Sequence, residues 1–311
     1  MRARSEIVVG VDGSGGSDAA VAWAATEARV RGVGLVIVCA IEEGATLLSW
    51  LPARIAIDEL REVGHPTVQA ACDVARRVEP DIPIRAGVLR GQPVRVLTTM
   101  SRHVPMVVVG RTGCANLLPF ALGSVATRLA AMSSCPVVIV PVPPDRDAPG
   151  HLARAVVFVD DANRRECEIA FALDEAALRG AEVVIAHATG MATLDPGARD
   201  YLRQKIAGIG AMYPQLTVSV EVLDGSLHDA VIGLSNPNTL MVLGHRRSRI
   251  ARNALGSNIR SVLQASLGPV AVVGQAALSD RVTLVRATSS VVVHAPVAVP
   301  AVAFQPEPTQ R

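Results

Sequence analysis

The stretch Ile7-Val8-Val9-Gly10-Val11-Asp12-Gly13-Ser14 decides the fold of this 311-residue chain. Its apolar, largely β-branched run predicts a buried strand that ends at Asp12, where a cluster of glycine and serine begins. An Ala-rich helical stretch follows, for which Ser17 or Asp18 can serve as the N-cap and Gly32 as the C-terminal stop. A buried strand joined to a helix by a glycine-rich turn is typical of an α/β sheet.

The rest of the first half repeats this alternation of short apolar runs and helical stretches. Further strands are expected at 35–38, 84–88, 106–109 and 137–140, and further helices at 66–77, 94–101 and from 124 onward. Continuous apolar strands that alternate with helices predict a parallel sheet buried on both faces. We therefore expect an α/β unit with a five-stranded parallel sheet between helices.

The chain contains this unit twice. Residues 6–41 align without gaps with residues 154–189, and later the Gly123-Ser124 pair aligns with Gly256-Ser257. A repeat of this length is typical of duplicated domains. We expect two tandem Rossmann-like domains at 1–143 and 153–278, a linker at 144–152, and a Val/Pro-rich extended or disordered tail at 279–311. Identical pairs in the first block include Asp12/Asp160, Glu27/Glu175, Arg31/Arg179 and Gly32/Gly180.

Composition excludes several function classes. Half of the residues are hydrophobic (50%) and only 19% are charged, which excludes a disordered chain. Thirty basic and 28 acidic residues leave a net charge of +2, so no DNA-binding surface is expected. Lys205 is the only lysine, which excludes a Walker-type phosphate loop.

Metal sites and membrane insertion are not expected either. The five cysteines include no Cys-x-x-Cys pair, and the seven histidines show no ligand spacing. The apolar run near the N-terminus is too short for a signal peptide, and no segment reaches the roughly 18 apolar residues of a membrane helix. We therefore expect a cytoplasmic protein without a metal site.

Candidate ligand-binding residues follow the predicted strands at their carboxyl ends, where open parallel sheets bind ligands. Glycines there let backbone N–H groups approach an anion, and a helix N-terminus adds free donors. An arginine suits phosphate oxygens, and an aspartate can accept from an amine or a ribose hydroxyl. The sequence thus predicts a nucleotide pocket, with phosphates at 110–125 and the base near Asp12 and Ile41. The candidates are Asp12, Gly13, Ser14, Ala40, Ile41, Gly110, Arg111, Gly113, Gly123, Ser124 and Val125.

Two motifs resemble those of the universal stress protein family. The segment from Val8 to Ser17 is similar to the family's opening motif, and Gly110-x2-Gly113-x9-Gly123-Ser124 matches the spacing of its ATP-binding signature. The resemblance covers both units. It implies an adenine nucleotide α-hydrolase-like fold, ATP as the ligand with Mg²⁺ as its companion ion, a homodimer, and a regulatory protein partner. The implied role is the control of stress, dormancy or growth, with no catalytic residues.

The second unit departs from this pattern. Asp160 is retained, but Asp161-Ala162 replaces Gly13-Ser14, and Arg247 stands where the loop has its second glycine. A side chain at that position should move or narrow the phosphate site. We therefore expect weaker or no binding there, with Asp160, Gly244, Gly256 and Ser257 as weak candidates.

An alternative is an enzyme of the same superfamily that hydrolyses or activates ATP. The segment 14–18 nearly matches the Ser-Gly-Gly-x-Asp-Ser/Thr loop of ATP pyrophosphatases. Ala19 stands where that loop requires a hydroxyl, and the strand ends two residues too early. The sequence therefore favours a regulatory ATP-binding protein, with a pure dimerisation scaffold as a third interpretation.

Overall fold

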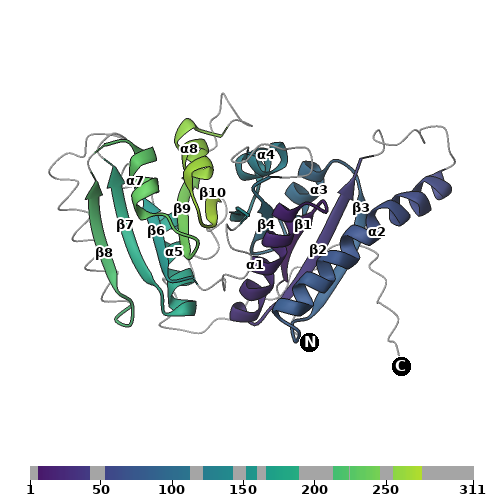
Figure 1. Cartoon of the computed structure of the whole chain (residues 1–311), viewed down its shortest axis with the longest axis horizontal. Helices are drawn as coiled ribbons and strands as arrows, with labels where there is room; N and C mark the ends of the chain where they lie inside the picture. The colour runs from purple at the N-terminus through teal and green to yellow at the C-terminus, as the bar shows by residue number, and fades with distance from the viewer. Residues whose placement is uncertain are drawn as a thin grey trace.

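A computed structural model describes residues 6–42, 53–112, 122–142, 152–159, 166–188, 213–223, 225–245 and 255–274. Within these residues ten strands form one sheet, in the order β3-β2-β1-β4-β5-β10-β9-β6-β7-β8 (Figure 1). Gly113, Asp160, the expected tail and all of the expected linker except Leu152 lie outside the described residues.

Each half contributes five strands to the sheet. The first half contains β1 (Glu6–Val11), α1 (Gly15–Arg31), β2 (Gly34–Ile41), α2 (Ala53–Val78), β3 (Ile84–Arg90), α3 (Pro93–Met100), β4 (Val107–Gly110), α4 (Ser124–Met132) and β5 (Val137–Val140). The second contains β6 (Arg154–Phe158), α5 (Glu166–Arg179), β7 (Glu182–Ala188), β8 (Val218–Leu223), α7 (Leu227–Leu234), β9 (Thr239–His245), α8 (Ser257–Ala265) and β10 (Val270–Gly274). The strands are parallel within each half, which confirms two Rossmann-like units.

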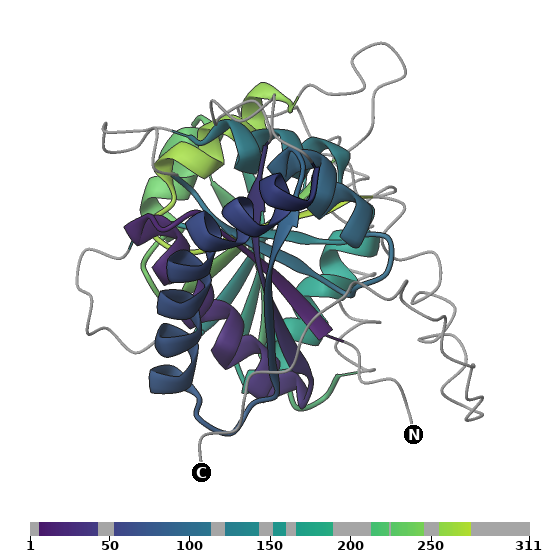
Figure 2. The same cartoon turned by 90° about the vertical axis from the view of Figure 1, so that its right-hand side faces the viewer.

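The sheet is buried on both faces. Ile7 and Val9 of β1 pack into a core with α1, α2 and α5, whereas Val8 packs into a second core with helices α3, α4, α7 and α8. This alternation follows from the two-residue period of a strand, and it explains why the central strands are continuously apolar. Figure 2 shows helices on both sides of the twisted sheet.

Two details of the helices differ from the sequence expectation. The N-cap of α1 is Ser14, whose Oγ accepts a hydrogen bond from the N–H of Ser17 at 3.2 Å, so neither Ser17 nor Asp18 is the cap. Helix α2 begins at Ala53 and continues through Pro66, where the sequence suggested a helix start. Gly32 ends α1 in the left-handed conformation (φ +64°), as expected for a C-terminal stop.

The two halves join edge to edge through β5 and β10. These equivalent strands pair antiparallel, with Val138 opposite Ala271. Pairing of the same element from each unit is the geometry of a two-fold symmetric interface. The last strand of each half is therefore paired within the chain, and the outer edges of the sheet are β3 and β8.

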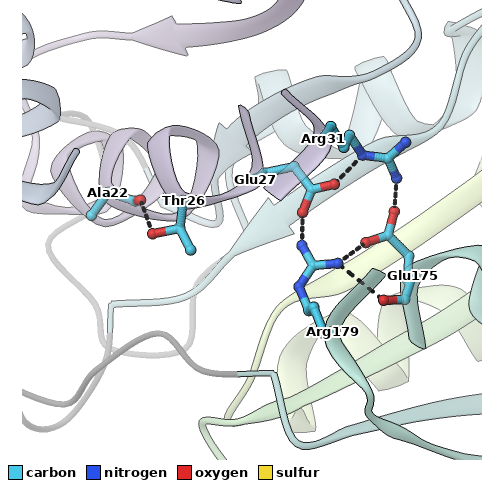
Figure 3. Close-up of polar contacts among 6 residues, drawn as sticks. All are labelled: Ala22, Thr26, Glu27, Arg31, Glu175 and Arg179. Carbon is cyan, nitrogen blue, oxygen red and sulfur yellow. Dashed lines mark hydrogen bonds and ion pairs between the residues drawn. The ribbon is translucent and has the colours of Figure 1, made fainter. Parts of the chain in front are cut away.

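An ionic ring of four side chains lies beside this junction (Figure 3). Arg31 and Arg179 each contact both Glu27 of α1 and Glu175 of α5, including a 2.7 Å contact from Arg179 Nη1 to Glu175 Oε2. Both carboxylates are fully buried, and burial lowers the pKa of Arg179 to about 10, so this guanidinium stays protonated at neutral pH. The ring explains why Glu27/Glu175 and Arg31/Arg179 are identical between the repeats.

Candidate functional site

The topology places the candidate site between β1 and β4. From β1 the chain runs outward to β2 and β3, then returns to β4 on the other side of β1. Gly10 of β1 lies opposite Val109 of β4, so both strands end side by side. The segments after these strands, 12–14 and 111–112, therefore meet at the point where the strand order reverses, which is where open α/β sheets bind ligands.

Asp12, Gly13 and Ser14 form a closed turn after β1. Asp12 is exposed, and its Oδ1 accepts hydrogen bonds from the N–H (3.1 Å) and Oγ (2.6 Å) of Ser14. Gly13 has φ +80°, which favours glycine. Asp12 thus stabilises the turn that presents Ser14 as the N-cap of α1.

The start of α1 lies in backbone contact with the end of β4. A Cβ on Gly16 would lie 2.4 Å from the carbonyl oxygen of Thr112, and one on Gly110 would lie 2.5 Å from the carbonyl carbon of Gly16. Ser14 Oγ also lies 3.4 Å from the Thr112 carbonyl oxygen, so its one proton can be shared between this oxygen and Asp12. Gly16 and Thr112 were not among the expected site residues. The paired glycines were the available signal, because close backbone approach requires them.

The third part of the site is the start of α4. The N–H of Gly123 donates to the carbonyl of Arg111, and the N–H of Arg111 donates to Val140 of β5, both at 2.8 Å. Gly123 is the N-cap and provides no capping side chain, while Ser124 is exposed as the first helical residue and Val125 is half-buried. The first-turn N–H groups have no acceptor within their helix and carry the positive end of its dipole. Such an end binds anions readily.

The guanidinium of Arg111 is engaged by the second half. Its Nη1 donates to the carbonyl of Ser266, the C-cap of α8, at 2.8 Å. Burial lowers the pKa of Arg111. A cation at a helix C-terminus is favourable, so this contact ties the candidate phosphate loop to the second half. The structure thus places Arg111 at the junction, a position that the residues around it in the sequence did not predict.

The end of β2 borders α2. Ala40 and Ile41 are half-buried, and the Ile41 carbonyl accepts a hydrogen bond from Gly91 at 2.8 Å. A Cβ on Gly64 of α2 would lie 3.0 Å from Ile41 Cδ1, so the α2 backbone packs closely against this side chain. Thr67 Oγ1 would lie 3.4 Å from a Cβ on Gly13. Gly64 and Thr67 of α2 therefore lie beside candidate site residues. The sequence did not predict that this helix begins as early as Ala53.

The second half repeats part of this arrangement. Gly256 is the N-cap of α8 and Ser257 its first residue, as Gly123 and Ser124 are for α4. Gly244 is half-buried at the end of β9, next to Val273 of β10.

Within the described parts of the chain, no group of three or more His, Cys, Asp or Glu side chains could hold a metal ion. None of the described helices has the length and apolarity needed to cross a bilayer.

The fold and the site together define the class of protein. It is a tandem α/β chain whose two Rossmann-like units are joined through their last strands, β5 and β10. The family model described as the universal stress protein family matches residues 4–141. Universal stress protein Rv2005c of Mycobacterium tuberculosis is 30% identical over 297 residues, covering 88% of this chain and 98% of that protein. Universal stress protein Rv1996 of the same organism is 30% identical over 298 residues, covering 86% and 94%. The chain belongs to the universal stress protein family.

A solved structure shows the same fold over most of the chain. A universal stress protein from Archaeoglobus fulgidus superposes with a TM-score of 0.69 at 21% identity, covering 87% of this chain and 98% of that one. The match across both halves agrees with the tandem arrangement.

Proposed function

We propose that the first half binds ATP at the crevice between β1 and β4. One observation carries this proposal: the N-terminus of α4, without a capping side chain, is held beside the ends of β1 and β4 through Arg111 and Gly123. This places backbone donors, which have no acceptor among the residues that the structure describes, where open sheets of this order bind ligands. The spacing from Gly110 through Gly113 to Gly123-Ser124 supports the same assignment.

We assign some of the candidate residues to the phosphates of the nucleotide and others to its nucleoside. Ser124 and the first-turn N–H groups of α4 suit the phosphates, because they are exposed donors at a positive helix end. Asp12, Gly13 and Ile41 suit the nucleoside end, with α2 behind them at Gly64. A Mg²⁺ ion would be held chiefly by the phosphates, since Asp12 is the only carboxylate among the candidate residues of the first half.

We infer a regulatory role without fast turnover. Hydrolysis needs a positioned water activator or a metal-supported γ-phosphate, and Asp12 is assigned to the nucleoside end of the nucleotide. The pyrophosphatase-like segment offers no open loop, because residues 15–18 belong to the first turn of α1. Sustained ATP hydrolysis faster than about one turnover per second would favour the enzyme alternative.

The proposal includes the cellular context that the family resemblance implied. We propose a cytoplasmic protein whose nucleotide-dependent conformation is recognised by a regulatory protein partner in stress, dormancy or growth control. A homodimer remains part of the proposal. It would need a surface other than the edges of β5 and β10, because these strands pair with each other in one chain.

Mass spectrometry of nucleotide released from the purified, denatured protein tests the ligand assignment. We expect ATP in the parent protein and a large loss of it in Ser124→Pro. This change removes both the backbone N–H and the hydroxyl of Ser124 but introduces a residue that the first turn of a helix tolerates. Ser257→Pro is the matched control, because it makes the same change at the start of α8. Equal nucleotide content in both variants would contradict the assignment.

A further inference from the structure

A cleft that two arginines line lies between α4 of the first half and α8 of the second. It has a volume of about 360 Å³, and its lining residues are Leu122, Ser124, Thr127, Arg128, Arg260 and Gln264. This size falls in the range of small-ligand sites. Both helices cover the same face of the sheet, next to the junction of the halves (Figure 1).

The charge in this cleft is unbalanced. Arg128 and Arg260 come from different halves, and the lining contains no carboxylate. Both arginines are exposed, and among the described residues neither has an ion-pair partner. By sequence, the segments that lead into the two helices, 113–121 and 246–254, contain no Asp or Glu. Two like charges on one concave surface favour an anion.

The cleft is continuous with the proposed nucleotide site through Ser124. This residue lines the cleft and also opens α4, where the phosphates are assigned. Thr127 and Arg128 follow on the same face of α4, since residues three and four apart in a helix are neighbours. Arg260 and Gln264 face them from α8. A phosphate chain at the start of α4 can therefore continue toward a cation of the other half.

We propose that the cleft between α4 and α8 binds phosphate groups, and that Arg260 of the second half supplies a charge to the ligand of the first. The preferred source of these phosphate groups is the bound nucleotide, whose terminal phosphates would reach the cleft. In this respect the inference rests on the proposed nucleotide site. A free polyphosphate has the same chemistry and is the second source. In either case the second half acts in phosphate recognition without an intact glycine loop of its own.

The two repeats provide the substitutions for a test. Arg260 aligns with Thr127, and Arg128 aligns with Ser261, so Arg260→Thr and Arg128→Ser install side chains that the other copy carries at the same helix position. Arg77→Ser is the charge-matched control, because this exposed residue lies at the end of α2, which packs on α1, β2 and β3. Titrations of the full-length protein with ATP, AMP and inorganic pyrophosphate separate the two sources.

We expect Arg260→Thr and Arg128→Ser each to weaken ATP binding about fivefold, with AMP binding unchanged within about twofold. The effect should shrink at high salt, because exposed charges are screened. If Arg260→Thr lost pyrophosphate binding but bound ATP as the parent does, the cleft would still be a phosphate site. Its ligand would then be a free polyphosphate. If the parent bound pyrophosphate through Arg260 but no adenine nucleotide, the cleft would stand and the proposed function would fail. If all three ligands bound the parent and both cleft variants equally, or if pyrophosphate and ATP did not bind at all, the cleft proposal would be overturned.

Discussion

At the scale of single residues, Gly15 and Gly16 are neighbours in the first turn of α1 but face different surroundings. A Cβ on Gly16 meets the Thr112 carbonyl at 2.4 Å, whereas one on Gly15 meets nothing within 4 Å. We predict that Gly16→Ala separates α1 from β4, destabilises the protein by about 1–3 kcal/mol and weakens ATP binding at least tenfold. Gly15→Ala should leave both nearly unchanged. Urea denaturation and calorimetric titration of the two variants test this pair, and equal behaviour would contradict the close approach.

The ionic ring gives a second prediction at this scale. Glu27→Gln removes one buried carboxylate and leaves Arg31 and Arg179 without half of their charge partners. We expect a loss of about 3–5 kcal/mol in the free energy of unfolding. Glu6→Gln, which breaks the more exposed pair with Arg85, should cost about 1 kcal/mol or less. Chemical denaturation that showed similar small losses for both would mean that the ring contributes little.

The sequence predicted which residues lie at the ends of strands and helices better than it predicted the contacts of their side chains. Asp12, Gly110 and Gly123-Ser124 follow from local strand and helix ends, and the structure brings them to one edge of the sheet. The contact of Arg111 with Ser266 was not predictable, because its partner lies 155 residues away and on the other repeat. Long-range contacts of this kind leave no local pattern.

At the scale of elements, the left-handed end of α1 can be tested separately from packing. Gly32 has φ +64°, and a Cβ there would meet nothing within 4 Å, so only backbone strain opposes a side chain. We predict that Gly32→Ala destabilises the protein by about 1–2 kcal/mol. Gly233→Ala, in α7 with equally open space and no positive φ, should instead stabilise it slightly. Thermal unfolding of both variants tests whether the melting temperature falls in Gly32→Ala and rises in Gly233→Ala. A shift in the same direction in both would contradict a cost from the left-handed conformation of Gly32.

The strands were more predictable than the helix ends. β5 matches the apolar run that predicted it, because a strand buried on both faces must be continuously apolar. The start of α2 was missed, because Gly64 and Pro66 usually interrupt helices. Here the glycine is required where α2 meets Val88 and Ile41.

At the scale of the whole molecule, the tail provides a prediction about where the fold ends. The last described strand, β10, ends at Gly274, and each half has five strands among the described residues. We therefore predict that deletion of residues 275–311 leaves ATP binding unchanged and shifts the melting temperature by no more than about 2 °C. A truncated protein that unfolds or loses nucleotide would show that the tail belongs to the core.

The repeat predicted two units but not how they meet. The family resemblance implied association between two chains, whereas β5, β10 and the ionic ring form contacts between the two halves of one chain. Sequence similarity between repeats cannot distinguish these cases, because an interface with two-fold symmetry needs the same residues either way.

A calorimetric titration of the full chain with ATP tests whether the first half binds the nucleotide. We predict one ATP per chain, bound by the first half. Gly113→Arg, which installs the residue of the second repeat, should abolish most of the binding while circular dichroism shows an intact fold. The reciprocal Arg247→Gly should leave the first site unaffected. Binding of ATP by Gly113→Arg with the affinity of the parent, or loss of binding in Arg247→Gly alone, would contradict a nucleotide site in the first half.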